Sequence, residues 1–148
     1  RCPQAQVVLV GAAGVSYGAK SEDGRSWRDR FLDEIRPQLT PAQIARLHFV
    51  GRLPHAQLIR LYQVTRAHVY LTYPFVLSWS MLEAMSAGAL VIGSRTAPVE
   101  EVIEHGRNGW LVDFFDRDGL ARACFDFLPH RALPDVRGWE EVDIFAHA

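Results

Sequence analysis

The sequence predicts an α/β domain: an open parallel sheet of about five strands with helices on both faces. Short apolar runs alternate with stretches of helical periodicity along the whole chain, and this alternation is typical of parallel sheets wrapped by helices. The apolar runs end at turn-forming residues and have the length of strands buried on both faces. A chain of 148 residues, 49% of them hydrophobic, suits about one domain with its own core.

Five strands are expected, at residues 6–10, 46–50, 67–71, 89–92 and 110–112. The first ends at Gly11 and is followed by residues 14–25, which are rich in Gly and Ser and predict a loop. Gly51 closes the second strand, and Asn108-Gly109 is a turn signal before the fifth.

The first two helices follow from spacing and caps. Ser26 is a suitable N-cap for a helix with Trp27, Phe31 and Ile35 on one stripe. We expect Pro37 and Pro41 to bracket the exit of this helix. Pro54 suits the first turn of the next helix, whose apolar positions repeat with helical spacing at Leu58, Leu61, Tyr62 and Thr65.

Three more helices are predicted in the second half of the chain. Ser78 or Ser80 caps a helix that runs through Met81, Leu82 and Met85 to Ala87 and is stopped by Gly88. Another opens at residues 96–98 and ends at Gly106. Asp116 caps the last, in which Leu120, Cys124 and Phe127 share a face.

Composition excludes several classes of protein. The formal net charge of −1 provides no basic field for nucleic acid or an anionic membrane. No apolar run approaches the roughly 20 residues that span a bilayer, and residues 1–6 lack a signal-peptide pattern. Two cysteines, Cys2 and Cys124, do not make a disulfide framework or a zinc site. We therefore expect a cytoplasmic protein, and the lack of an initiator Met suggests a piece of a longer one.

Ligands of open parallel sheets bind beyond the carboxyl ends of the strands. The candidate loops are therefore residues 11–17, 51–54, 72–80 and 93–99. The densest group of polar candidates is the segment from Tyr73 to Gly88. There the amides of Ser78, Trp79 and Ser80 would face outward at the positive end of a helix dipole, suited to a diphosphate.

One helical turn further, Glu83 would present a carboxylate to the same loop, and a carboxylate is a natural acceptor for a ribose diol. The residues alone leave a second interpretation open, in which Ser78 merely caps the helix and Glu83 is an exposed surface charge.

Several ordered segments resemble one family. Residues 49–53 with 58–62 look like a strand-Gly-loop-helix, residues 82–94 contain Leu-Glu-Ala-Met followed by a strand, and residues 101–112 carry Glu-Val-Ile and Asn-Gly-x-Leu-Val. Together with the closing helix at 116–127, they resemble the C-terminal donor-binding domain of retaining glycosyltransferases of group 1. These enzymes are built from two Rossmann-like domains (the GT-B fold). The resemblance covers nearly all of residues 7–128.

The resemblance implies roles at matching positions. Glu83 would hold the donor ribose, and Ser78, Trp79 and Ser80 would meet the diphosphate. The main chain of Gly51, Arg52 and Leu53 would read the nucleotide base, with Leu58 packing nearby. Gly11 and Gly14 would line the loop that faces the cleft and the sugar phosphates, and Ser16 and Tyr17 extend that loop.

Two departures from the family's pattern stand out. The family's first acidic residue, which contacts the transferred sugar, lies eight positions before the ribose-binding Glu, and here that position is Phe75. The family's phosphate-gripping Arg and Lys would lie upstream of the first strand, outside this chain.

The resemblance implies a nucleotide-sugar-binding domain at residues 1–128, followed by a tail at 129–148 in which residues 139–146 can form a short helix. The whole enzyme would transfer a hexosyl group from a nucleotide-diphosphate sugar to an acceptor hydroxyl, without a metal ion or other cofactor. The acceptor domain would precede this chain, so we expect the 148 residues alone to be inactive. In the full protein, a peripheral place at the inner face of a membrane is compatible with this view.

Two other functions remain open. Phe75 is compatible with a module that binds a nucleotide or nucleotide sugar without turning it over. A flavodoxin-like domain would need an Asp cluster at the strand ends, which the sequence does not show.

Among weaker candidates, Asp116-Arg117-Asp118 imitates a metal-binding motif but sits where a helix cap is expected. Arg95 could neutralise a phosphate or be an ordinary surface charge. Trp79 could stack on a ligand or pack within the protein. The His residues lack metal-ligand spacing.

Overall fold

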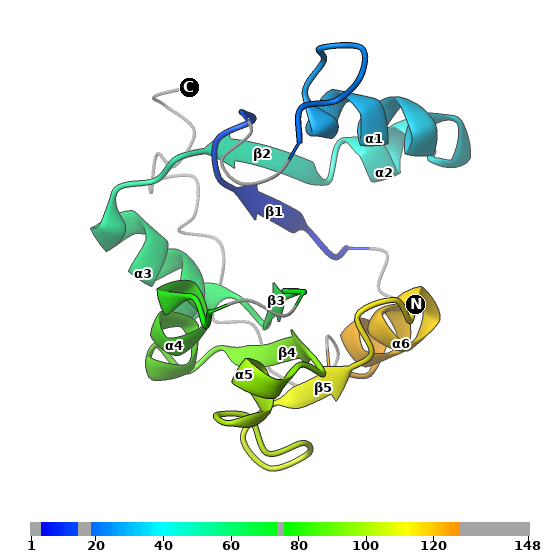
Figure 1. The fold of residues 1–148 in the computed structure, drawn as a ribbon. Helices are drawn as coiled ribbons and strands as arrows, with labels where there is room; N and C mark the ends of the chain where they lie inside the picture. Colours follow the sequence, from blue (N-terminus) through cyan, green and yellow to red (C-terminus); the bar gives the residue numbers. More distant parts are fainter. Residues whose placement is uncertain (1–3, 15–18, 74–75, 128–148) are drawn as a thin grey trace. The chain divides into compact units, whose positions relative to one another are not determined.

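The computed structural model describes residues 4–14, 19–73 and 76–127. These residues divide into two compact units, whose elements are labelled in Figure 1. The N-terminal unit comprises the described residues up to 54, and the C-terminal unit comprises those from 55 onward. Each unit is described by itself. Ser16, Tyr17, Phe75 and the tail at 128–148 lie outside the described residues.

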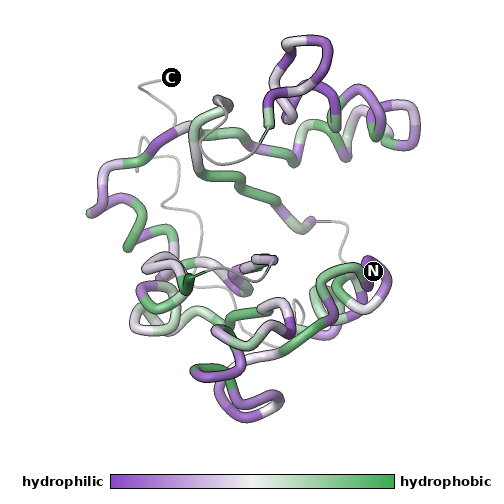
Figure 2. The backbone as a smooth tube through the Cα atoms, in the orientation of Figure 1, coloured by the Kyte–Doolittle hydropathy of each residue, from purple (hydrophilic) through white to green (hydrophobic). Residues whose placement is uncertain are grey.

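The N-terminal unit contains two parallel strands, β1 (Val7–Val10) and β2 (Leu47–Gly51). Their register pairs Val7 with Leu47 and shifts by one residue before Val10. Hydrophobic residues run along β1, whereas the turn before the first helix is hydrophilic (Figure 2). The expectation of strands buried on both faces is wrong for β1, because Val7 and Leu9 are 48% and 43% exposed. A two-stranded sheet offers too few neighbours to cover both faces.

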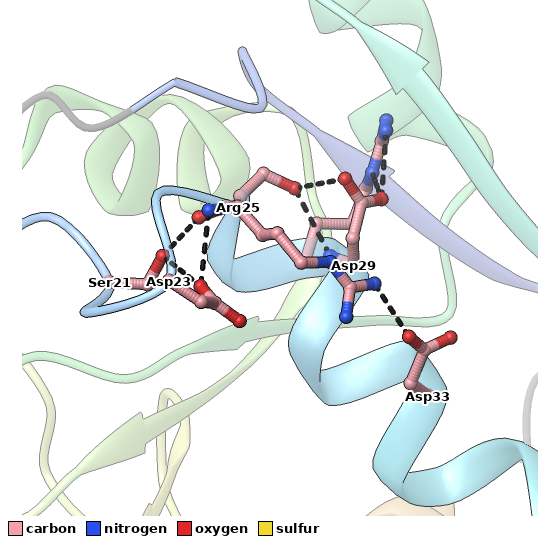
Figure 3. Close-up of polar contacts among 7 residues, drawn as sticks. Ser21, Asp23, Arg25, Asp29 and Asp33 are labelled. Atoms are coloured by element: carbon pink, nitrogen blue, oxygen red, sulfur yellow. Dashed lines mark hydrogen bonds and ion pairs between the residues drawn. The ribbon is translucent and has the colours of Figure 1, made fainter.

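Helix α1 (Trp27–Ile35) begins where the sequence predicts, because Ser26 Oγ accepts a hydrogen bond from the amide of Asp29 at 3.1 Å. Around this cap, a polar network fixes the preceding turn (Figure 3). Asp23 accepts from the Ser21 hydroxyl at 2.9 Å and from the Arg25 amide at 3.1 Å, and both bonds lower the pKa of its carboxyl. Arg25 also pairs with Asp33 at 2.5 Å.

The exit of α1 differs from the prediction. A short 3-10 helix η1 (Arg36–Gln38) follows directly, and Pro41 opens a further helix, α2 (Pro41–Ile44). Thr40 and Gln43 form a capping box, in which Gln43 Oε1 accepts from the Thr40 amide at 2.8 Å. The sequence Thr-Pro-Ala-Gln therefore starts a helix rather than ending one, since Pro is favoured at the first helical position.

The C-terminal unit holds three parallel strands in the order β3 (Ala67–Tyr70), β4 (Leu90–Ser94) and β5 (Trp110–Val112). In the register, Ile92 pairs with Val69 on one side and Trp110 on the other. Because the strands are parallel, their carboxyl ends lie at one edge of the sheet. The segments after Tyr70, Ser94 and Val112 therefore start at this edge.

Helices cover both faces of this sheet. On one face, Val91 packs in a hydrophobic cluster with Met81 of α4 (Trp79–Ser86) and Val99 of α5 (Ala97–Glu100), joined by Tyr62 of α3 (His55–Val64). On the other face, Ile92 and Val112 pack against Ala123 of α6 (Arg117–Phe127). Neighbouring residues of β4 thus contribute to opposite clusters, as the alternation of side chains along a strand requires.

Two predicted bounds in this unit are wrong by two residues or more. Strand β4 extends to Ser94, and α5 ends at Glu100 instead of continuing to Gly106. After α5, side chains satisfy the backbone: Asn108 Oδ1 accepts from the Glu104 amide at 2.8 Å, and its Nδ2 donates to the Val102 carbonyl at 2.9 Å. Such local side-chain bonds compete with helix continuation.

The α/β class predicted from the sequence is confirmed, with five parallel strands flanked by helices within the described residues. The strands form two small sheets, one in each unit, where the sequence predicted a single open sheet.

Candidate functional site

The predicted phosphate segment begins a helix at the carboxyl edge of the C-terminal sheet. Ser78 is the N-cap of α4, with extended backbone (φ −85°, ψ 142°), and its Oγ accepts from the Ser80 amide at 3.3 Å. Of the two caps that the sequence allowed, the structure selects Ser78. The Ser78 amide donates to the buried Tyr70 hydroxyl at 2.9 Å, which ties the start of α4 to the end of β3.

A second hydroxyl fixes the loop that leaves β3. Ser94, at the end of β4, is fully buried. Its Oγ accepts from the Thr72 amide at 3.0 Å and donates to the Thr72 carbonyl at 2.8 Å. Because one hydroxyl satisfies both backbone groups of Thr72, the loop is anchored at its first turn.

The three predicted phosphate donors are not equivalent. The Ser78 amide is bonded to Tyr70, and the Ser80 amide is bonded to the cap. Among the described residues, none accepts a hydrogen bond from the Trp79 amide. The hydroxyls of Ser78 and Ser80 lie 3.0 Å apart, within hydrogen-bonding distance. The structure therefore offers two adjacent hydroxyls and one amide here, rather than three outward amides.

Glu83 lies one turn further along α4 and pairs with His55, the first residue of α3. Glu83 Oε1 and His55 Nε2 are 2.9 Å apart, and the two side chains are 28% and 69% exposed respectively. Tyr62 is close by: burial, and secondly the negative charge of Glu83, raise the pKa of its hydroxyl. The carboxylate thus sits between helices and retains access to solvent.

The remaining predicted residues of the C-terminal unit take different positions. Trp79 is 78% exposed, so the packing alternative for this residue is wrong. Leu58 is only partly buried, and it packs against the hydrophobic cluster of α3 and α4.

The predicted base-binding and loop glycines lie in the N-terminal unit. The Gly11 amide donates to the Gly51 carbonyl at 2.7 Å, which brings the ends of β1 and β2 together. Gly11 (φ 141°) and Gly51 (φ 67°) adopt backbone conformations that other residues rarely take. Gly14 has no such requirement. Arg52 is exposed and Leu53 is half-buried.

The weaker candidates take structural roles. Asp116 caps α6, because its Oδ1 accepts from the Gly119 amide at 2.8 Å. Arg95 pairs with Glu100 at 3.2 Å on the surface. Cys124 packs beside the Ile92 cluster, and burial raises the pKa of its thiol.

The histidines in strands contact neighbouring side chains: His48 Nε2 lies 2.7 Å from Gln6 Oε1, and the ring of His68 packs edge-on against Tyr62. Across residues 4–14, 19–73 and 76–127, no three His, Cys, Asp or Glu side chains gather as a metal site would require. None of the helices in these same ranges has the length and hydrophobicity of a membrane span.

Sequence analysis missed three residues that shape this site: His55, Tyr70 and Ser94. Tyr70 and Ser94 contact residues distant in sequence through hydroxyl groups, which leave no periodic signal. His55 follows Pro54 at a predicted helix start, and that local pattern says nothing of a carboxylate 28 residues away.

Comparisons with known proteins place this geometry in a family. The model of the family described as "Glycosyl transferases group 1" matches residues 3–130. The N-acetyl-alpha-D-glucosaminyl L-malate synthase of Bacillus anthracis is 38% identical over 53 residues, which are 36% of this chain and 14% of that enzyme.

The chain is also similar in fold to crystal structures of Anabaena HepE. The complex with UDP matches with a TM-score of 0.63 at 24% identity, over 84% of this chain and 32% of HepE. The complex with UDP-glucose matches with a TM-score of 0.58 at 20% identity, with the same coverage. The chain thus spans about a third of HepE and a smaller part of the curated relative. Since the family model covers most of its length, the chain belongs to the group 1 glycosyltransferase family.

Proposed function

We propose that this chain is the C-terminal, nucleotide-sugar-binding part of a retaining glycosyltransferase that transfers a hexosyl group to an acceptor hydroxyl. The observation that carries the proposal is the partly exposed Glu83 carboxylate, one turn behind the capped start of α4 at the carboxyl edge of the sheet. That edge is where open parallel sheets bind their ligands.

The start of α4 is suited to the diphosphate. The hydroxyls of Ser78 and Ser80 and the amide of Trp79 provide donors at the positive end of the helix dipole. In the transfer reaction negative charge grows on the leaving diphosphate, so donors fixed in place before the reaction lower its barrier. Tyr70 and Ser94 hold this segment to the sheet and so keep the donors in position.

Glu83 is suited to the donor ribose, because its carboxylate can accept hydrogen bonds from both hydroxyls of a diol. Gly51, Arg52 and Leu53 are proposed for the base, and Gly11 and Gly14 for the loop facing the sugar phosphates, on the family resemblance. UDP and UDP-glucose, which HepE binds, are the first donors to test. The acceptor and the upstream phosphate-binding Arg and Lys are assigned to a separate N-terminal domain.

Titration of the chain with UDP, ADP, GDP and their glucose conjugates, followed by backbone amide shifts, tests the proposal. Binding should shift the amides of residues 78–83, and Glu83→Ala should weaken it by about 1–3 kcal/mol, the range for a hydrogen bond to a charged group. Glu101→Ala removes an exposed carboxylate from the same unit and serves as the matched control. An affinity that survives Glu83→Ala removes Glu83 from the site.

The second candidate is a module that binds nucleotide sugars without transferring the sugar, motivated by Phe75 at the family's first acidic position. The two candidates differ in one assay. A protein that includes the N-terminal domain should transfer sugar if the first is right, and should only bind the donor if the second is right. The 148 residues alone should show no turnover under either.

A further inference from the structure

We propose that His55 is a positioning residue, which holds the Glu83 carboxylate in the orientation that receives the donor ribose. The inference rests on the function proposed above and adds a residue that neither motif nor spacing had indicated. It starts from the 2.9 Å contact between His55 Nε2 and Glu83 Oε1.

The chemistry of the pair fixes its protonation pattern. A carboxylate is an acceptor only, so Nε2 of His55 must carry the hydrogen in this contact. A neutral imidazole is then the Nε2–H tautomer, and its Nδ1 is left as an acceptor. The contact constrains one oxygen of Glu83 and leaves the second for a further donor, such as a ribose hydroxyl.

The location of the pair supports a positioning role over a stabilising one. The His55 side chain is 69% exposed, and exposed ion pairs add little to folding stability. The Glu83 side chain has three rotatable bonds, however, and without a partner it must be ordered when the ligand binds. Fixing a carboxylate beforehand reduces that cost, which is the usual benefit of preorganisation.

Among the described residues, the hydrogen bond to the Glu83 carboxylate comes from His55. Tyr62, on the same helix as His55, is close enough for the charge of Glu83 to act on its hydroxyl. That hydroxyl carries no charge near neutral pH, since its ordinary pKa of about 10 is raised further. His55 also stands at the amino end of α3, where the helix dipole favours a nearby negative charge. The helix dipole and the hydrogen bond from His55 both favour a carboxylate directed toward the start of α3.

The test compares nucleotides with and without the ribose diol. Affinities of the chain for UDP, ADP and GDP, and for their 2′,3′-dideoxy analogues, are measured by calorimetry for the wild type, His55→Ala, His55→Gln and Glu83→Ala. The double variant His55→Ala/Glu83→Ala completes the cycle. Gln63→Ala, an exposed substitution on the same helix, is the control for general effects on α3.

His55→Ala should weaken the tightest nucleoside diphosphate by about two- to tenfold, the cost of ordering one flexible side chain at binding. It should leave the dideoxy analogue unchanged and have no further effect in the Glu83→Ala background. His55→Gln should restore most of the affinity, because its amide can donate to the same oxygen. Gln63→Ala should change neither affinity.

Equal weakening of the nucleotide and its dideoxy analogue would overturn the positioning role, since the ribose diol would then be uninvolved. An unchanged affinity in His55→Ala, or failure of His55→Gln to restore it, would overturn it as well. If the wild-type chain binds none of the nucleotides, the proposed function fails and this inference with it. If the wild-type chain binds a nucleotide and His55→Ala binds it with the same affinity, this inference is rejected and the proposed function is not.

Discussion

The Ser94 hydroxyl provides the sharpest test of how the site is held together. Ser94→Ala deletes one buried oxygen that bonds both the amide and the carbonyl of Thr72, at 3.0 and 2.8 Å. Each such bond contributes about 0.5–1.5 kcal/mol net, so their joint loss should destabilise the unit by about 1–3 kcal/mol. The loss of stability should be about 3 kcal/mol if water cannot replace the lost bonds to Thr72, and about 1 kcal/mol if it can.

The effect should be local as well as global. Hydrogen exchange of the Thr72 amide reports directly on the lost bond, and urea unfolding followed through amides of β4 and β5 reports on the whole C-terminal unit. In Ser94→Ala the Thr72 amide should exchange about 5- to 150-fold faster at unchanged pH, since about 1.4 kcal/mol is a factor of ten.

Ser86→Ala is the matched control, because Ser86 lies exposed on α4. That substitution should change stability by no more than about 0.5 kcal/mol. The reasoning is refuted if Thr72 exchanges at the wild-type rate in Ser94→Ala, or if the two serine variants unfold at the same urea concentration.

Three further predictions concern the same unit. Gly93→Ala should lower the free energy of unfolding by about 1–3 kcal/mol through overpacking, because the added Cβ would lie 2.9 Å from Val99 Cγ1. Thermal unfolding measures this loss, and a wild-type midpoint would contradict it. Asn108→Ala should lower the free energy of unfolding by about 1–3 kcal/mol, since the Asn108 side-chain amide bonds two backbone groups. Arg107→Ala breaks an exposed ion pair and should lower it by less than about 1 kcal/mol. Equal urea midpoints for the two variants would contradict this contrast. Burial lowers the pKa of His68 from its ordinary 6.5, so the unfolded chain binds the proton more readily than the folded one. The stability that this residue contributes above pH 6.5 should therefore fall as the pH decreases below 6.5. An NMR titration of the imidazole that gives a pKa at or above 6.5 would contradict this.

The sequence by itself determined most of the local structure. Apolar runs placed the five strands of the described residues. For β4 the reason is that a strand covered by helices on both faces must be hydrophobic over its length. Ser26 and Asp116 identified helix starts through their capping side chains, and both caps are present in the structure. For α4 the sequence allowed Ser78 or Ser80, and the cap is Ser78. These signals depend on residues a few positions apart, so the sequence alone is enough to predict the strands and helix starts that they specify.

Local signals were weaker where competing backbone partners existed. Thr40 and Pro41 start a helix, although the sequence predicts that Pro41 marks the exit of the preceding one. A Pro at the first helical position lacks only a hydrogen that the helix does not use. After α5, the Asn108 side chain bonds the Glu104 amide and the Val102 carbonyl, which a longer helix would have satisfied, so the helix does not continue.

Tertiary structure alone decided which donors are available at the start of α4 and what Glu83 contacts. The hydroxyl of Tyr70 takes the Ser78 amide, Ser94 anchors the loop, and His55 meets Glu83 across two helices. Each contact joins residues separated by at least eight positions, and its formation depends on how helices and strands pack. No spacing along the chain encodes that packing, so the chemistry of the edge emerges only once the fold brings these side chains together.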